Sequence, residues 1–303
     1  MRTRHATFLA GLLAASLVLP GGAAAQETAP SLDEAANAVI QGIFDRPIRL
    51  VDGLYEGQAF VEGGAQRPRV TMARTLSLTG DFDADGRADR AIFLTHDGGG
   101  TGRFVYLALL TATGMGPENT LTVAIGDRVH VHDLSFDDGV LTVGMVGHGP
   151  ADPGCCASHD MEVRVTAEDG ELIARESVVR GRALPAMLDG TAWRLARFDW
   201  DAQPVDEEIE ITLEVADGRV AGVAACNRYF ADIVQPEDPE PLALEFEAIG
   251  VTRMACPEPR MTAEDRFLDR LAGAEAFNFE FGDLVILYAT VGENGAMVLT
   301  RQE

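Results

Sequence analysis

Residues 209–215 read Ile-Glu-Ile-Thr-Leu-Glu-Val, so apolar and polar side chains alternate at every position. Successive side chains of a β-strand point to opposite faces of a sheet, which gives this stretch one face for a core and one for water. The turn sequence Asp217-Gly218 follows and leads into a second apolar run, 220–225. This segment therefore predicts an antiparallel hairpin, and the same pattern recurs along both halves of the chain.

The first half is predicted to be an antiparallel β module over residues 26–180. Ser31 and Glu34 have the spacing of a capping box, and apolar residues continue at helical spacing to Ile43, which predicts an opening helix. After it, short strands are separated by Asp-Gly and Gly-rich turns. The expected strands cover residues 70–78, 91–95, 104–110, 129–136, 140–146, 161–166 and 172–178.

Residues 181–187 are predicted to link this module to a second one, residues 188–303. Thr262 and Asp265 indicate the start of a helix whose apolar stripe contains Phe267, Leu268 and Leu271. The predicted fold class is mostly β, with two antiparallel β domains, the second a small barrel or sheet with one packed helix. Its further expected strands cover residues 242–246, 277–281, 284–289 and 297–300.

The composition excludes some classes of function. The chain has 303 residues, a hydrophobic share of 47% and a net charge of −24, and it contains no lysine. A nucleic-acid-binding surface must neutralise phosphates with cationic side chains, so nucleic acid is not an expected partner. The acidic excess predicts a solvated surface that keeps the protein monomeric.

The N-terminus has the features of an export signal. Arg2 and Arg4 precede an apolar run, 8–19, and small residues at 23–25 form a cleavage site. We therefore expect residues 1–25 to be a signal peptide and the mature protein to be periplasmic or secreted. The apolar run is too short to span a bilayer, and no later segment is suited to membrane insertion after cleavage.

Four motifs in the second half resemble the META/HslJ domain family. They are Leu188-Asp-Gly-Thr-Ala-Trp193, Val223-Ala-Ala-Cys226-Asn227-Arg-Tyr229, Ile249-Gly-Val-Thr252-Arg-Met254-Ala-Cys256, and Met261 followed by Glu264 and Phe267. The resemblance covers about residues 188–303 and implies a small β-rich extracytoplasmic domain without established catalysis, associated in some members with heat-shock induction and antibiotic tolerance. The family usually has glycine where this chain has Ala225. The first half resembles, less specifically, an uncharacterised module of bacterial secreted proteins and lipoproteins.

The four cysteines fall into two pairs. Cys226 and Cys256 lie in two of the motifs above, and in an oxidising compartment we expect them to form a disulfide across a separation of 30 residues (256 − 226). Cys155 and Cys156 are adjacent, which leaves a vicinal disulfide, two free thiols or bonds to other chains. No cationic residue adjoins this pair in the sequence, so a structural role is favoured over a redox one.

Residues 81–89 resemble a calcium loop. Four aspartates occupy positions 1, 3, 5 and 9, and Gly86 at position 6 permits a sharp turn. Position 12, where an EF-hand has glutamate, is Ile92, so the match is to a shorter loop found between β-strands. The alternative is a solvated hairpin turn neutralised by Arg87 and Arg90. The candidate ligands are Asp81, Asp83, Asp85 and Asp89 through their carboxylates and Arg87 through its backbone carbonyl.

The favoured function is that of an exported, non-catalytic periplasmic protein that binds a protein or small ligand and contributes to envelope stress tolerance. One alternative is an envelope-acting hydrolase that uses acidic residues near the Asp81–Asp89 loop. Another is an adaptor of a secretion apparatus. The sequence contains no Gly-x-Ser-x-Gly elbow and no His-Glu-x-x-His helix. A deep polar pocket would favour the enzyme, whereas an apolar or acidic surface patch would favour the binding protein.

Overall fold

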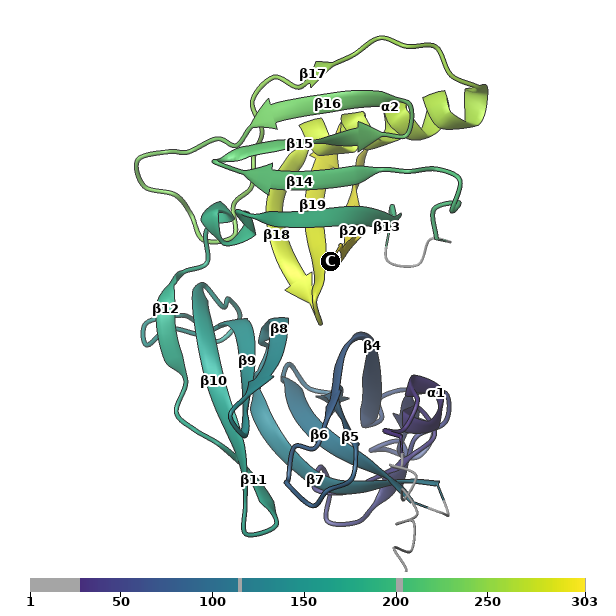
Figure 1. Ribbon diagram of the computed structural model, residues 1–303, viewed down its shortest axis with the longest axis vertical. Helices are drawn as coiled ribbons and strands as arrows, with labels where there is room; N and C mark the ends of the chain where they lie inside the picture. The colour runs from purple at the N-terminus through teal and green to yellow at the C-terminus, as the bar shows by residue number, and fades with distance from the viewer. Residues whose placement is uncertain (1–27, 114–115, 200–203, 303) are drawn as a thin grey trace, which may run out of the picture.

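The computed structural model shows two parts, coloured purple to teal and green to yellow in Figure 1. It describes residues 28–113, 116–199 and 204–302, and the expected signal peptide lies outside these ranges. Strands dominate both parts, which confirms the mostly-β fold class. None of the helices in the described ranges has the length and apolar character needed to cross a bilayer.

The first part contains a seven-stranded sheet with the order β2-β1-β7-β6-β5-β4-β3. All neighbours pair antiparallel except β1 and β7, which pair parallel. The sequence pattern did not indicate the strand β7. The bounds are β1 Val39–Ile40, β2 Ile48–Arg49, β3 Leu54–Glu56, β4 Arg69–Gly80, β5 Asp89–Asp97, β6 Arg103–Thr113 and β7 Gly116–Asp127.

The central strands of this sheet are buried on both faces. In β5, Ala91 and Phe93 contribute to one apolar core, while Ile92 and Leu94 contribute to a second core on the opposite face. This explains why residues 91–94 are continuously apolar instead of alternating.

A second sheet, with the order β11-β10-β9-β8 and with β12 also paired to β10, covers one face of the first. The expected strand 172–178 is wrong, because the chain forms two separate strands there that pair with different stretches of β10. Residues 181 and 182, expected in the linker, belong to the second of them. The bounds are β8 His130–Asp137, β9 Val140–Gly147, β10 His159–Glu168, β11 Glu171–Ala174 and β12 Val178–Arg182.

The opening helix is much shorter than predicted. The capping box at Ser31 and Glu34 is present, but α1 covers only Leu32–Ala35. Val39 and Ile40 instead form a strand that pairs with β2 and β7, and Ile40 is 1% exposed. The apolar spacing was compatible with both structures, and packing against the sheet decided for the strand.

The second part is an eight-stranded, barrel-like sheet with the order β17-β16-β15-β14-β13-β20-β19-β18. Its core contains Trp193 and Tyr229, and Phe267 from α2 packs against the Tyr229 ring at 5.3 Å between centroids. The bounds are β13 Thr191–Arg197, β14 Thr212–Ala216, β15 Arg219–Ala224, β16 Asn227–Asp232, β17 Gly250–Val251, α2 Glu258–Ala272, β18 Ala274–Glu280, β19 Asp283–Thr290 and β20 Glu293–Arg301.

Two sequence expectations for this part need correction. The helix α2 begins after Pro257, so Thr262 lies inside the helix and is not its cap. Proline suits the start of a helix because its missing N–H would have no partner there. The expected strand 242–246 forms only isolated bridges, Ala243 to Ala276 and Phe246 to Ile233.

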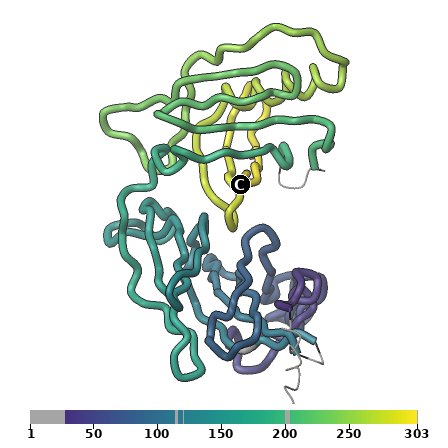
Figure 2. The backbone as a smooth tube through the Cα atoms, viewed as in Figure 1, coloured from purple at the N-terminus to yellow at the C-terminus, as the bar shows by residue number. Residues whose placement is uncertain are grey.

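The hairpin between β18 and β19 reaches the first part of the molecule, as the tube in Figure 2 shows. Gly282 N donates to Val131 O at 3.1 Å, and Thr75 Oγ1 donates to Phe281 O at 2.8 Å. Phe281 is 9% exposed and belongs to the core between the two N-terminal sheets. The two parts therefore pack against each other through a shared core and are not joined by the linker alone.

Candidate functional site

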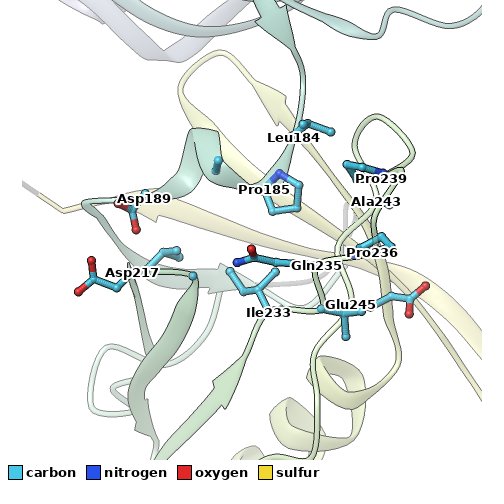
Figure 3. A pocket seen from close by; sticks show the side chains of 14 residues that line it. Leu184, Pro185, Asp189, Asp217, Ile233, Gln235, Pro236, Pro239, Ala243 and Glu245 are labelled. Atoms are coloured by element: carbon cyan, nitrogen blue, oxygen red, sulfur yellow. The ribbon is translucent and has the colours of Figure 1, made fainter.

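A cavity of about 570 Å³ lies where the connection between the two parts meets the end of the C-terminal sheet. One wall is the segment 184–189, which includes the 3-10 turn η1, Pro185–Leu188. The facing walls come from 215–218, at the turn after β14, and from 233–245, after β16 (Figure 3). We call this cavity the linker groove.

Backbone hydrogen bonds hold the walls of the linker groove together. Gly190 N donates to Val215 O at 2.8 Å, and Leu242 N donates to Ala183 O at 2.7 Å. The turn at Gly218 is tied to the facing strand end, because Ile233 N donates to Gly218 O at 2.9 Å. Backbone hydrogen bonds thus connect the three segments that form the walls of the groove.

The linker groove has an apolar floor and an acidic rim. Val215 and Ile233 on the floor are 3% and 6% exposed. Asp189 and Asp217 lie at one end and Glu245 at the other (Figure 3), and all three carboxylates are exposed. Among the described residues that line the groove there is no lysine, arginine or histidine. The arrangement suits a ligand with an apolar body and a positively charged group.

The structure brings together three of the four predicted calcium-binding carboxylates. Asp81, Asp83 and Asp89 each offer an oxygen, and these atoms lie within 4.8 Å of one another. Asp85 is held instead by Arg87, whose backbone N donates to its carboxylate at 2.8 Å and whose guanidinium forms an ion pair with it at 2.6 Å. The loop therefore offers a cluster of three carboxylates, with the fourth engaged beside it.

Asp89 anchors this cluster. It is fully buried and accepts hydrogen bonds from Phe82 N at 3.1 Å and from the hydroxyl of Thr111. Burial raises the pKa of Asp89, and the charges of Asp83 and Asp85 act in the same direction, while the two hydrogen bonds oppose them. A cation at the cluster would relieve this mutual repulsion of the carboxylates.

Cys226 and Cys256 are joined by a disulfide, with their Cα atoms 6.0 Å apart. Next to the bond, the buried side chain of Asn227 connects three segments. Its Nδ2 donates to Glu264 Oε1 at 2.9 Å, and its Oδ1 accepts from Met254 N at 2.7 Å. These motif residues thus fasten α2 and the segment after β17 to the sheet. They form a structural network and do not face the linker groove.

Cys155 and Cys156 are joined to each other, and both are exposed. The sequence indicated no cation next to them, but the fold brings one close to the preceding residue, Gly154. Arg128, from the turn between β7 and β8, has its Nη2 3.6 Å from the position that a Cβ on Gly154 would take. Sequence proximity could not show this contact, because 26 residues (154 − 128) separate the two.

Serine, histidine and aspartate meet in the loop before β10, but not as a catalytic triad. Ser158 Oγ lies 2.9 Å from Nδ1 of His159, and Asp152 Oδ2 lies 3.3 Å from the same nitrogen. A proton relay requires the nucleophile and the carboxylate on different ring nitrogens. Asp152 also accepts from Ser158 Oγ at 2.8 Å, so its contacts fix the loop rather than orient a base.

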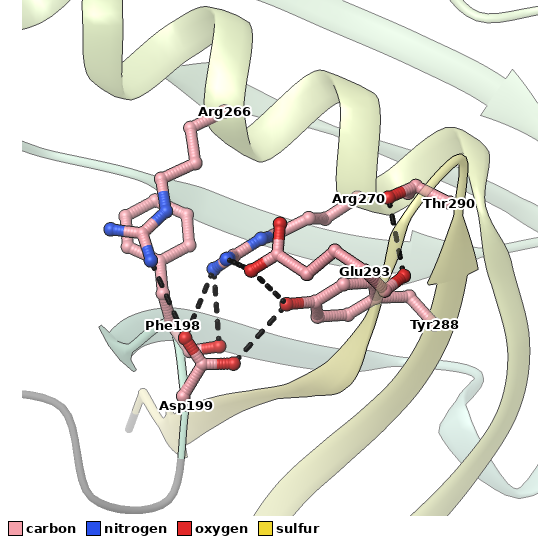
Figure 4. Close-up of polar contacts among 7 residues, drawn as sticks. All are labelled: Phe198, Asp199, Arg266, Arg270, Tyr288, Thr290 and Glu293. Carbon is pink, nitrogen blue, oxygen red and sulfur yellow. Dashed lines mark hydrogen bonds and ion pairs between the residues drawn. The ribbon is translucent and has the colours of Figure 1, made fainter.

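The C-terminal part also contains a buried cation, Arg270, which is not among the residues that line the linker groove. The guanidinium of Arg270 is enclosed by the rings of Phe198 and Tyr288, at 5.1 and 4.8 Å, and is paired with Asp199 and Glu293 (Figure 4). Arg266 also pairs with Asp199 at 3.4 Å, so two guanidinium groups face two carboxylates in the cluster. Arg270 also donates to Phe198 O at 3.3 Å. This cluster locks α2 onto the β19–β20 hairpin and leaves little capacity for a ligand.

The sequence reasoning did not find the linker groove. Its lining combines short stretches from three segments, of which none has a recognisable motif. One signal was present: the prolines at 236, 239 and 241 indicated an exposed irregular loop, and Pro185 stood in the expected linker. Sheet pairing brings these stretches together, which a linear pattern does not show.

Comparisons with known proteins complete the description of the site. A family model described as META domain matches residues 186–303. No curated protein matches the chain. One matching solved structure is titled "NMR structure of the protein from Burkholderia xenovorans"; it is 21% identical, the match covers 42% of this chain and 94% of that chain, and the TM-score is 0.30.

Proposed function

We propose that the protein, whose residues 186–303 match the META domain model, is an exported, non-catalytic binding factor whose linker groove holds a cationic amphiphile. Such a role would contribute to envelope stress tolerance by sequestering the compound. The observation that carries the proposal is the apolar floor of the groove under a rim of exposed carboxylates. Its volume of about 570 Å³ falls in the usual range for small-molecule sites.

Charge supports the choice of a cation. Two exposed unit charges about 4 Å apart interact by only about 1 kcal/mol in water, so each rim carboxylate contributes modestly. A cation gains this energy and an anion loses it, so the difference between the two is about 2 kcal/mol per close contact. The apolar floor then provides affinity, while Asp189, Asp217 and Glu245 provide selectivity for sign.

Within the linker groove, the exposure of the carboxyl groups favours a binding role over hydrolysis. A general acid that works near neutral pH requires a carboxyl group shielded from water, as a rule in an apolar pocket. The three rim carboxylates of the linker groove are exposed. The Asp152, Ser158 and His159 arrangement gives no relay either, because serine and aspartate share Nδ1.

Export is the second component of the proposal. The predicted signal peptide, residues 1–25, would deliver a monomeric protein to the periplasm or the exterior. Both cysteine pairs are at bonding distance, which suits an oxidising compartment. Mass spectrometry of the exported protein should find Gln26 at its N-terminus, whereas recovery of only the uncleaved chain would contradict export.

Calcium is the cofactor that we propose for the N-terminal part. Asp81, Asp83 and Asp89 supply the hard oxygen ligands that this ion prefers, on a loop that contains a glycine with φ of 83° at position 86. The ion would order the loop between β4 and β5 and take no part in chemistry. In this proposal the Arg87 carbonyl and Asp85 are the remaining candidate ligands.

Calorimetric titration with two probes of equal chain length tests the groove. Decylammonium should bind the mature protein at least tenfold more tightly than decanoate, with both kept below micelle formation. Replacing Asp189 and Asp217 by asparagine should reduce that preference severalfold. Asparagine also tolerates the φ of 53° at position 217. The control Glu214→Gln removes an exposed charge on β14 outside the lining and should leave the preference unchanged.

Equal binding of the two probes would contradict the proposed charge selection. An equal loss of preference in the Glu214→Gln control would show that net charge, and not the rim, attracts the cation. Saturable binding of both probes that survives Ala243→Trp, which fills the groove, would place the binding elsewhere. The matched control for this change is Ala221→Trp, on an exposed position of β15.

A further inference from the structure

The bond between Cys155 and Cys156 has no evident role in stability. A disulfide stabilises a fold mainly by closing a loop of the unfolded chain, and a bond between neighbouring residues closes none. Cys226–Cys256 differs in this respect, because it spans 30 residues and Cys226 is 7% exposed. Both sulfur-bearing residues of the adjacent pair are exposed, so the pair is accessible to reagents in water.

The loop that carries the pair is held in place without the bond. Asp152 Oδ2 accepts from Gly149 N at 2.8 Å and from Ser158 N at 3.1 Å, so one carboxylate ties both ends of the loop together. The hydrogen bond from Gly149 N, followed by those from the side chains of Ser158 and His159, lowers the pKa of Asp152 to about 2, so the carboxylate stays charged. Ala183 N donates to Ser158 O at 2.8 Å and fixes the loop to the start of the connection. Opening the disulfide would leave these contacts intact.

A positively charged side chain lies beside Gly154, the loop residue that precedes the pair. The guanidinium of Arg128 is next to Gly154, which directly precedes Cys155. Its Nη2 is paired with Asp127 at 2.5 Å, while its buried Nε has no hydrogen-bond partner in the described part of the chain. A nearby guanidinium favours a thiolate over a thiol, and a stabilised thiolate is a better leaving group in thiol–disulfide exchange.

We infer that Cys155–Cys156 is a reversible dithiol–disulfide centre, reduced by an external dithiol. A thiolate of the reductant attacks one sulfur of the pair and forms a mixed disulfide with it, while the Cys–Cys bond breaks and the other cysteine leaves as a thiolate. The second thiol of the reductant then attacks the mixed disulfide. The reductant ends as its own disulfide, and two electrons and two protons have passed to the protein as two cysteine thiols.

Graded reduction of the mature protein tests this inference. The chain is treated with increasing dithiothreitol at pH 7, thiols are alkylated, and each pair is quantified by peptide mass spectrometry. Cys155 and Cys156 should react at a reductant concentration at least tenfold below that needed for Cys226 and Cys256. The circular dichroism spectrum should be unchanged at that point, and dialysis in air should restore the bond.

Two variants examine the contribution of the guanidinium. Arg128→Gln should slow reduction of the adjacent pair severalfold and weaken the pH dependence of alkylation of the reduced thiols between pH 6 and 9. The control Arg180→Gln removes an exposed arginine on β12 that pairs with Glu162 and should change neither rate. Cys155→Ser combined with Cys156→Ser should leave the melting temperature of the protein within about 2 °C of the wild type.

Simultaneous reduction of both pairs would overturn the inference. So would loss of the folded spectrum when only Cys155 and Cys156 are reduced, since the bond would then be structural. Quantitative alkylation of Cys155 and Cys156 before any reductant is added would show free thiols and likewise refute the centre. None of these results bears on ligand binding in the linker groove.

Discussion

Phe281, at the tip of the β18–β19 hairpin, packs against Phe93 of β5 with 5.6 Å between the ring centroids. The two residues are 188 positions apart (281 − 93) and lie in different parts of the molecule. Phe93 is fully buried and Phe281 is 9% exposed, so the contact is part of a core and not a surface touch. The C-terminal and N-terminal parts are therefore coupled by this aromatic pair and the hydrogen bonds around it, together with a ring contact between His132 and Phe279 at 5.2 Å and an ion pair between Arg103 and Glu280 at 3.5 Å.

Phe281→Ala should weaken this coupling. Deleting a buried phenylalanine side chain costs about 3–5 kcal/mol when the cavity does not collapse. Calorimetry of the variant should show the unfolding of the two parts separating into two transitions. Phe230→Ala, at a 52% exposed position of β16, is the control and should shift the melting temperature little. A single unaltered transition in Phe281→Ala would show that the hairpin tip does not couple the parts.

Asp283 should make stability depend on pH. It is 5% exposed, and burial raises the pKa of its carboxyl group to about 6, against the attraction of Arg197. The folded protein keeps the proton on this carboxyl group up to about pH 6, whereas the unfolded chain releases it near pH 4. The free energy of unfolding is therefore highest below about pH 4 and falls as the pH rises through 6. Between pH 4 and 7 the free energy of unfolding of the wild type should therefore fall by about 1–3 kcal/mol relative to that of Asp283→Asn.

Urea unfolding at pH 4, 5, 6 and 7 measures this difference. Asp169→Asn, at an exposed hairpin turn, serves as the control and should give a curve parallel to that of the wild type. Parallel curves for Asp283→Asn and the wild type would mean that the carboxyl group of Asp283 titrates normally in the folded protein.

Calcium should stabilise the N-terminal part through the carboxylate cluster. Free calcium at about 100 times its dissociation constant should raise the free energy of unfolding by about 2.7 kcal/mol. Asp83→Ala should remove most of this gain, while Asp138→Asn, at an exposed turn with φ of 47°, should retain it. Identical melting curves of the wild type in chelator and in calcium would leave residues 81–89 as an ordinary hairpin turn.

Ala225 occupies a backbone conformation that favours glycine. Its φ is 64°, at the position before Cys226 where the related family usually has glycine. An L-residue other than glycine costs roughly 1–2 kcal/mol in this region. Ala225→Gly should therefore destabilise the protein by about 1 kcal/mol less than Ala231→Gly, a control at a buried position of β16 without positive φ. Equal losses of stability in the two variants would contradict backbone strain at Ala225.

Local sequence patterns predicted the regular strands but not their partners. The run 70–78 lies within β4, and within the predicted hairpin 209–225 the residues 212–216 and 219–224 form strands, while 209–211 lie before the first strand. The segment 32–43 has apolar spacing that suits a helix, yet Val39 pairs with Glu118 of β7, which lies 79 residues away (118 − 39). Only tertiary pairing could decide between the two structures.

The candidate sites also differ in whether local sequence or tertiary contacts bring their residues together. Asp81, Asp83 and Asp89 are close in sequence, so their clustering could be predicted from spacing alone. The linker groove requires residues 184–189 to lie beside 233–245, which depends on hydrogen bonds such as Leu242 N to Ala183 O. Arg128 beside the Cys155–Cys156 pair is likewise a product of the fold. Contacts between distant segments leave no trace in one sequence.

The most direct test of the central claim is to locate the bound probe by NMR. The backbone amides of the isotopically labelled mature protein are followed while decylammonium is added to saturation. We predict that the largest shift changes fall in residues 184–189, 215–218 and 233–245 and follow one saturation curve, while residues 81–89 remain unchanged. Shift changes that are scattered over the acidic surface, or absent from these three segments at saturation, would contradict a binding function of the linker groove.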